Sequence, residues 1–129
     1  KSDEIISRRR DIAERYDELL ADINGVTVPE VIDGGVHNYQ CYCVYIEAGD
    51  TDLRDELIEA MAEEEIETQI GTYALHHTDA FSDARQHGSL ANSTALHHNL
   101  LTLPVAHGMT ESDQQRVVET LQSEIKSRT

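Results

Sequence analysis

One ten-residue segment constrains the fold of this chain more than any other. Residues 38–47 read NYQCYCVYIE, and alternate side chains of a strand point to opposite faces of a sheet. Neither face is strongly polar: one carries Tyr39, Cys41, Cys43 and Tyr45, and the other carries Gln40, Tyr42, Val44 and Ile46. A strand that is apolar on both faces is typical of the centre of a sheet. We therefore expect a central strand covered on both sides, with both cysteines buried.

Helical periodicity lies on both sides of this strand in the sequence. Apolar residues at helical spacing predict a first helix, with a stripe formed by Ile5, Ile12, Tyr16, Leu19 and Ile23. Further helices are predicted after a cap among Asp50, Thr51 and Asp52, over residues 89–99, and from Thr110, with Asp113 near a capping-box position. The central strand is expected to end at Gly49-Asp50. Two shorter strands are predicted at residues 66–70 and 100–103, and residues 26–31 are predicted to be extended. This order predicts an α/β chain, a two-layer α+β sandwich in which a small three-stranded sheet packs against helices.

Length and charge limit the classes of function. The 129 residues suit one domain, residues 1–129, and no apolar run approaches the roughly 18 residues of a membrane span. Acidic residues number 25 against 10 lysines and arginines, which gives a formal charge of −15. Nucleic acids and anionic membranes both attract basic surfaces, so neither partner is expected. The charge fits either a halophilic source, for which the melting temperature should rise strongly with KCl, or simply an acidic domain.

The cysteines and histidines offer little for a metal. Cys41 and Cys43 are too close in sequence for an ordinary disulfide, which indicates a reduced, cytoplasmic chain. The seven histidines include the adjacent pairs His76-His77 and His97-His98. Adjacent side chains point in different directions, so each pair offers at most one convenient ligand, and neither HExxH nor CxxC accompanies them. We expect no metal site, and histidines that are solvated or locally hydrogen-bonded.

A loop after the second predicted strand is the best candidate for a binding site. Gly71 ends that strand, and residues 72–78 follow as a loop that carries Tyr73 and His76. Loops at strand ends often present functional groups, and both side chains can take part in proton exchange or hydrogen bonding. The sequence contains no GxSxG, GxGxxG or P-loop motif. Tyr73 and His76 are therefore candidate binding residues, and a purely structural role is their alternative.

Several motifs follow one another in the order of a known family. They are Arg9-Arg10 with Tyr16 in the first helix, HNYQCY at residues 37–42, RDELI at 54–58, IGTYALH at 70–76, LTLP at 101–104 and Met109-Thr110. Over about residues 5–121 the chain resembles the C-terminal small domain of the DegT/StrS family of sugar aminotransferases. Two positions depart from the family pattern: Glu65 stands where the family often has glycine, and Gln40 where many members have histidine. Loss of the glycine should cost stability or force another turn geometry.

The resemblance implies a fold and a chemistry. Members are pyridoxal-phosphate (PLP) enzymes of fold type I, whose small domain has a mostly antiparallel sheet. The full enzyme would move an amino group from glutamate or glutamine to a nucleotide-linked keto-sugar, for polysaccharide or glycan synthesis, and would form a homodimer. Its Schiff-base lysine would lie in its own large domain, absent from this chain, whose lysines are Lys1 and Lys126. The resemblance thus implies no catalytic or PLP-binding residue in this chain, and it implies that Tyr73 and His76 contact the nucleotide-sugar substrate.

Two other functions stay open at this point. The chain could be a free-standing regulatory or ligand-binding α/β domain, or a small His-rich metal-binding protein. The gene upstream of Lys1 distinguishes the first, because roughly 250 further residues with a Schiff-base lysine are expected for the aminotransferase. An immediate start codon would favour the regulatory domain. Elemental analysis without added metal tests the metal-binding protein.

Overall fold

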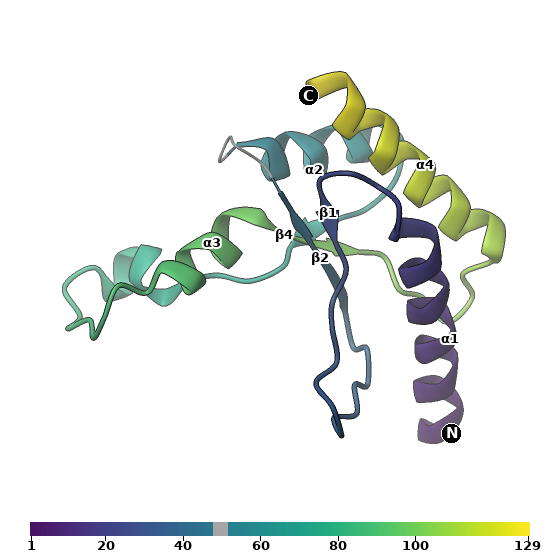
Figure 1. Cartoon of the computed structure of the whole chain (residues 1–129), viewed down its shortest axis with the longest axis horizontal. Helices are drawn as coiled ribbons and strands as arrows, with labels where there is room; N and C mark the ends of the chain where they lie inside the picture. Colours follow the sequence, from purple (N-terminus) through teal and green to yellow (C-terminus); the bar gives the residue numbers. More distant parts are fainter. Residues whose placement is uncertain (48–51) are drawn as a thin grey trace.

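The sheet predicted from the sequence is present, with one strand more than expected. The computed structural model describes residues 1–47 and 52–129. Four antiparallel strands lie in the order β1-β2-β4-β3, with the bounds Val26–Thr27 for β1, Tyr42–Ile46 for β2, Gln69–Ile70 for β3 and Leu100–Leu103 for β4. The predicted α/β class, with a small antiparallel sheet packed against helices, is confirmed (Figure 1). The additional strand is β1, in the stretch that the sequence predicts only to be extended.

The helices follow the predicted order. They are α1 (Ser2–Leu20), α2 (Leu53–Glu63), α3 (Ala91–Asn99) and α4 (Glu111–Arg128), with two short 3-10 helices, η1 (Leu75–His77) and η2 (Asp79–Phe81). Asp52 is the N-cap of α2, while Asp50, Thr51 and the strand end predicted at Gly49-Asp50 lie outside the described residues. None of the helices among the described residues combines the length and apolar character needed to cross a bilayer.

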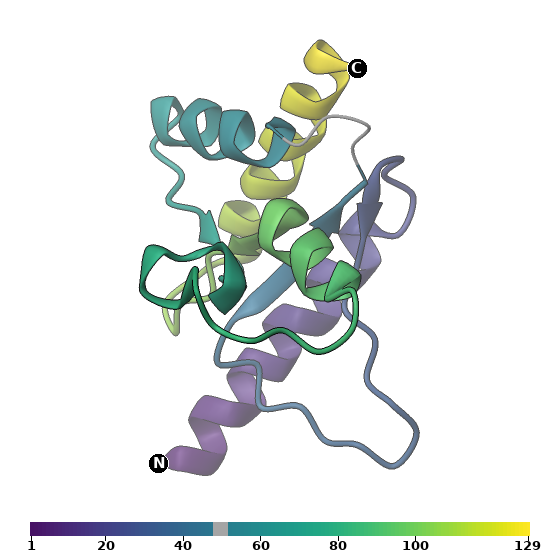
Figure 2. The same cartoon turned by 90° about the vertical axis from the view of Figure 1, so that its left-hand side faces the viewer.

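One face of the sheet is buried beneath α1, α2 and α4 (Figures 1 and 2). Alternate residues of β2 and β4 enter this core together with apolar side chains of the three helices, among them Tyr42, Val44, Ile46, Leu101, Leu103, Tyr16, Leu57, Met61 and Leu121. On the opposite face Cys43 and Tyr45 are only half-buried, and Cys41 is exposed. The prediction of buried cysteines is therefore wrong. The second face of β2 is covered only in part, where Asn99 of α3 donates to the Tyr45 hydroxyl at 3.2 Å. β2 is nevertheless central, since it pairs with β1 on one side and β4 on the other.

Local hydrogen bonds shorten the predicted central strand at its start. The Tyr39 N–H donates to Nδ1 of His37 at 2.8 Å, and Tyr39 has a φ of 49°, outside the strand region. Arg9 of α1 donates to the carbonyl oxygens of Tyr39 and Gln40 at 3.0 and 2.7 Å. Side-chain partners of this kind compete with the hydrogen bonds of a strand ladder. β2 therefore begins at Tyr42 rather than at residue 38.

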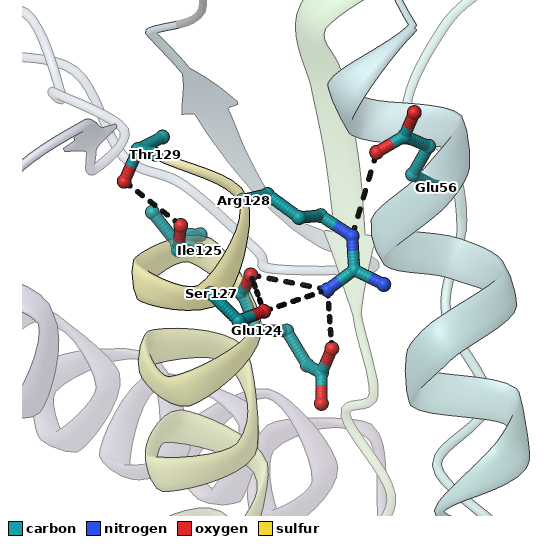
Figure 3. Close-up of polar contacts among 6 residues, drawn as sticks. All are labelled: Glu56, Glu124, Ile125, Ser127, Arg128 and Thr129. Atoms are coloured by element: carbon teal, nitrogen blue, oxygen red, sulfur yellow. Dashed lines mark hydrogen bonds and ion pairs between the residues drawn. The ribbon is translucent and has the colours of Figure 1, made fainter.

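Polar contacts fix both ends of α4. The predicted capping box is confirmed at its start: the Asp113 N–H donates to Thr110 Oγ1 at 3.1 Å, and the Thr110 N–H donates to Asp113 Oδ2 at 2.8 Å. At its end Arg128 forms an ion pair with Glu124 one turn earlier and another, at 3.4 Å, with Glu56 of α2 (Figure 3). The guanidinium thus links α4 to α2, although exposed ion pairs contribute only about 0 to 1 kcal/mol each.

The turn after α2 has the geometry that usually calls for glycine. The Ile66 N–H donates to the Met61 carbonyl at 2.9 Å and the Glu65 N–H donates to the Ala62 carbonyl at 3.0 Å, which are the two bonds of a Schellman motif. Glu65 has a φ of 59°, in the left-handed region where a side chain is strained. The turn therefore has the geometry that glycine usually adopts, and the Cβ of Glu65 makes its backbone conformation strained.

We expect Glu65→Gly to raise the free energy of unfolding by about 1 kcal/mol, because glycine adopts this conformation without a Cβ clash. Urea unfolding of both proteins measures the change. Glu64→Gly is the matched control, since it removes the same charge one residue earlier, where φ is −90°. The control should be neutral or destabilising. Equal stabilisation by both variants would assign the effect to the acidic charge at the helix end instead.

Candidate functional site

We name residues 72–99 the arm, because they leave the sheet after β3 and return to it at β4. The arm contains η1, η2 and α3, and it extends away from the sheet and from α1 and α4 (Figure 1). Figure 2 views the molecule from the side of the arm. β3 and β4 pair directly, with Ile70 opposite Leu101, so the arm is a long excursion within an antiparallel hairpin. The predicted loop over residues 72–78 begins the arm, and the helix predicted over residues 89–99 ends it as α3.

The base of the arm is held at the carbonyl oxygen of Leu100. This oxygen accepts hydrogen bonds from the Gly71 N–H at 2.8 Å and from Nη1 of Arg54 at 3.0 Å. Arg54 belongs to α2, is only 4% exposed, and pairs through Nε with Asp55 at 2.5 Å. A Cβ on Gly71 would come within 2.6 Å of the Leu100 side chain, so the close approach requires glycine. These contacts fasten the two ends of the arm to α2.

Both predicted site residues line one hollow in the arm. The hollow has a volume of about 530 Å³, in the range of small-molecule sites, and its lining includes Tyr73, Leu75, His76, Phe81, Arg85 and His87. Tyr73 is 63% exposed and His76 is half-buried. The structure therefore brings Tyr73 and His76 to the same hollow. The sequence reasoning missed Phe81, Arg85 and His87, and the signal that could have found them is the single phenylalanine of the chain, close to two basic residues in an irregular segment.

Arg85 differs from the other arginines in its contacts. The 10 basic residues are two lysines and eight arginines. Seven of the arginines bond to carbonyl oxygens or carboxylates: Arg8, Arg9, Arg10, Arg15, Arg54, Arg116 and Arg128. Within residues 1–47 and 52–129, Arg85 has no hydrogen-bonding or ion-pair partner. An unpaired guanidinium beside a hollow with aromatic walls can bind an anion and stack on a flat ring.

Four histidines of the arm lie against one another. The ring of His77 is 4.5 Å from that of His76, 4.8 Å from that of His97 and 5.4 Å from that of His98, measured between centroids. Nε2 of His76 and Nε2 of His77 both contact the Thr94 hydroxyl, at 2.9 and 3.2 Å. In the described part of the chain, no three His, Cys, Asp or Glu side chains are arranged to hold a metal ion. The histidine pairs therefore meet through ring contacts and a shared hydroxyl, which is the locally bonded arrangement that we expect from the sequence.

We expect the chain to lose stability between pH 7 and pH 5, with His97 as one cause. Nδ1 of His97 accepts a hydrogen bond from the Ala74 N–H at 3.1 Å. Burial is the main cause that lowers the pKa of His97 from its usual 6.5, and the further causes are His77, His98, Arg54 and His76. The folded state therefore binds this proton less readily than the unfolded state. The contribution to stability is complete above about pH 6.5 and falls as the pH drops below it.

The His97→Asn variant tests this pH dependence. Asparagine keeps an acceptor for the Ala74 N–H but does not titrate, so the urea midpoint of the variant should depend less on pH than that of the wild type. His107→Asn is the control, because His107 is exposed and lies outside the arm. Identical pH profiles for wild type and His97→Asn would contradict the expectation.

Comparison with known proteins identifies the family. The sequence model of the DegT/DnrJ/EryC1/StrS aminotransferase family matches residues 1–122. The chain belongs to this family. Among curated proteins, it is 28% identical over 127 residues to the dTDP-4-dehydro-2,3,6-trideoxy-D-glucose 4-aminotransferase of Saccharopolyspora spinosa, covering 98% of this chain and 31% of that protein.

Solved aminotransferase structures share the fold. The aminotransferase TlmJ from Streptoalloteichus hindustanus has a TM-score of 0.81 at 26% identity, over 96% of this chain and 32% of that one. DesI, whose structure was determined in the presence of its TDP-sugar product, has a TM-score of 0.81 at 27% identity, over 95% of this chain and 33% of that one. The chain therefore spans about a third of the length of the relatives that it matches.

The lysines of this DegT-family chain do not fit a PLP site. A PLP-dependent aminotransferase holds its cofactor as a Schiff base with a lysine. Lys1 precedes α1 and Lys126 lies in the last turn of α4, and both are exposed and outside the arm. The described residues therefore offer no amine beside the hollow for this bond.

Proposed function

We propose that residues 1–129 are the C-terminal small domain of a PLP-dependent aminotransferase that moves an amino group from glutamate or glutamine to a nucleotide-linked keto-sugar. The family assignment supports the reaction class. The names of two relatives support the substrate class, since one is named for a dTDP-linked dehydro-sugar and DesI was solved with a TDP-sugar product. Because the chain spans a third of its relatives, a large domain of the same protein would supply the lysine and the PLP. PLP serves as an electron sink when it is bound.

The observation that carries the substrate assignment is the unpaired Arg85 beside aromatic side chains in the hollow of the arm. A nucleotide-linked sugar joins a flat base to a sugar through negatively charged phosphates. Guanidinium groups bind phosphate oxygens with paired hydrogen bonds, and the rings of Tyr73 and Phe81 offer surfaces for a flat base. A chain with a net charge of −15 repels phosphates in general, so a local cation is what such a ligand needs. We assign the phosphate contact to Arg85.

Tyr73 and His76 are proposed to contact the nucleotide-sugar without serving as catalytic groups. The Thr94 hydroxyl bonds to Nε2 of His76 and orients its ring at the hollow. The exposed Tyr73 stands at the same hollow and makes an edge contact with the ring of His97, at a centroid distance of 6.1 Å. We also propose, from the family resemblance, that the full-length protein is a cytoplasmic homodimer that serves polysaccharide or glycan synthesis.

The full-length protein loaded with PLP is expected to convert keto-sugar nucleotides into amino-sugar nucleotides, with glutamate or glutamine as donor. Arg85→Gln should raise KM for the nucleotide-sugar about tenfold or more, because a hydrogen bond to a charged group is worth about 1.5 to 3 kcal/mol. KM for the amino donor should stay unchanged. Arg116→Gln is the matched control. Arg116 of α4 donates to the Glu64 carbonyl and does not line the hollow.

Each part of the proposal has its own contrary result. A PLP-loaded protein that turns over none of a panel of keto-sugar nucleotides contradicts the reaction. His76→Ala with the wild-type kcat and KM contradicts the role of that residue. An Arg85→Gln variant with the KM of the Arg116→Gln control contradicts the phosphate contact.

A further inference from the structure

Exposed apolar side chains occur in two parts of the described chain. Eight large hydrophobic side chains are exposed among residues 1–47 and 52–129, and four of them belong to the arm. The other four, which the proposed binding site does not use, are Ile5 of α1 and three residues of the loop between β1 and β2: Val31, Ile32 and Val36. Ile32 and Val36 are the most exposed of the eight, at 82% and 81%.

Hydrogen bonds from α1 hold the loop between β1 and β2 in place. Arg9 and Arg10 donate to the carbonyl oxygens of residues 37, 39 and 40, at distances of 3.1, 3.0 and 2.7 Å. At the tip of the loop the Gly35 N–H donates to the Ile32 carbonyl at 2.8 Å, which closes a turn. The apolar tip, residues 31–36, is therefore carried on a loop that is fastened to a helix.

The first turns of α1 extend beyond the core in the same direction. The apolar stripe predicted for this helix starts at Ile5, which is 45% exposed, whereas the buried part of the helix starts at Ile12, which is 1% exposed. Figures 1 and 2 both show the start of α1 and the loop between β1 and β2 at the same end of the molecule, opposite the end of α4. An apolar stripe that continues past the core is expected to pack against another surface.

We propose that this end of the molecule, formed by Ile5 of α1 and by the loop tip at residues 31–36, docks on the part of the same protein that precedes Lys1. The docking rests on the proposed function, in which residues 1–129 are the C-terminal domain of a longer chain. About two thirds of the length of the relatives lies outside the region that this chain covers. A preceding domain would join at Lys1, directly before α1, and would therefore stand at the end where these side chains lie.

The charges of the loop favour this partner over a second copy of the chain. Glu30 and Asp33 are exposed beside the apolar side chains of the tip. Two copies that met through this end would bring the acidic groups of both loops together, in chains that each carry a charge of −15. We expect the preceding domain to offer an apolar hollow for Ile32 and Val36, with basic side chains at its rim.

The test is the labelling of introduced thiols by a maleimide in the full-length protein. Ile32→Cys and Val36→Cys place a thiol at the two most exposed positions, and Ser123→Cys places one on the exposed surface of α4 as a control. Peptide mass spectrometry follows each thiol separately from the natural cysteines, and each rate is divided by the rate of the same thiol in concentrated urea. We expect labelling to be slowed about 100-fold or more at residues 32 and 36, because a docked thiol reacts only when the interface opens, and little at residue 123.

The contrary results distinguish the docking from the proposed function. If residues 32 and 36 react as fast as residue 123 in a PLP-loaded, active protein, the docking is overturned and the proposed function stands. Protection that disappears on dilution would overturn it as well, because a second copy would then be the cover. A full-length protein that binds PLP and turns over no keto-sugar nucleotide contradicts the proposed reaction, while slow labelling in that protein would still support the docking.

Discussion

Replacing Tyr42 with alanine is expected to lower the free energy of unfolding by about 3 to 5 kcal/mol. The Tyr42 ring is fully buried in β2 and packs against the Tyr16 ring of α1, with centroids 4.9 Å apart. Its hydroxyl donates to Oδ1 of Asp17 at 2.5 Å. Alanine leaves a cavity where the central strand meets α1, and the surrounding helices close it only in part. Urea unfolding of the two proteins measures the loss.

Tyr42→Phe separates the packing of the ring from its hydrogen bond. This variant keeps the ring and should cost about 1 kcal/mol, because the half-exposed Asp17 carboxylate regains water when it loses its donor. Tyr73→Ala removes an exposed ring and should change stability by about 0.5 kcal/mol or less. If Tyr42→Ala costs no more than Tyr73→Ala, the burial of Tyr42 is contradicted.

The elements that the sequence predicts well have their signals within a few residues. The start of α4 is an example, because Thr110 and Asp113 form the capping box with each other and need no other part of the chain. The alternation in residues 38–47 likewise indicates a central strand, and β2 does lie between two partners. The resemblance also directs attention to Glu65, whose left-handed conformation the structure reveals.

The errors arise where a partner distant in the sequence decides the local structure. Strand β1 has two residues, and only their pairing with Tyr45 and Ile46 makes them a strand. Arg9 holds the carbonyl groups of residues 39 and 40 away from the ladder, which no pattern within 38–47 indicates. The apolar character of Cys41 and Cys43 predicts a fully covered face, yet α1, α2 and α4 all pack on the other side of the sheet and α3 reaches this face only near Tyr45.

The candidate site is predicted only in part because the arm has little regular pattern. Tyr73 and His76 follow Gly71 at a strand end, and their position beside a glycine draws attention to them. Arg85 stands in an irregular segment, and its significance depends on what the other seven arginines bind. That comparison needs the structure, because a sequence does not indicate which arginines donate hydrogen bonds to backbone carbonyl groups.

Unfolding above pH 10 is the second large effect that we expect. Burial is the main cause that raises the pKa of both Tyr16 and Tyr42 well above the usual 10.0. The negative charge of Asp113 raises the pKa of Tyr16 further, and the hydrogen bond to Asp17 raises that of Tyr42 further. The folded state keeps two phenol protons that the unfolded state releases near pH 10. Their contribution to stability is complete below that pH and falls above it by about 1.4 kcal/mol per pH unit for each tyrosine. Two pH units would remove about 5 to 6 kcal/mol, which is comparable to the whole stability of a small domain.

The alkaline transition should couple ionisation to unfolding. Tyr16 and Tyr42 should ionise only as the protein unfolds. The part of the tyrosinate absorbance that belongs to them should therefore rise at the same pH at which the helical circular dichroism is lost. A variant with both Tyr16→Phe and Tyr42→Phe starts from a lower stability at pH 7, but its free energy of unfolding should fall less steeply above pH 10. Tyr73→Phe removes an exposed phenol and should keep the wild-type slope, which controls for general repulsion in an acidic chain. Complete ionisation of all tyrosines near pH 10 with an intact fold would contradict the buried position of the pair, because a phenolate in the core lacks both water and a cation to stabilise it.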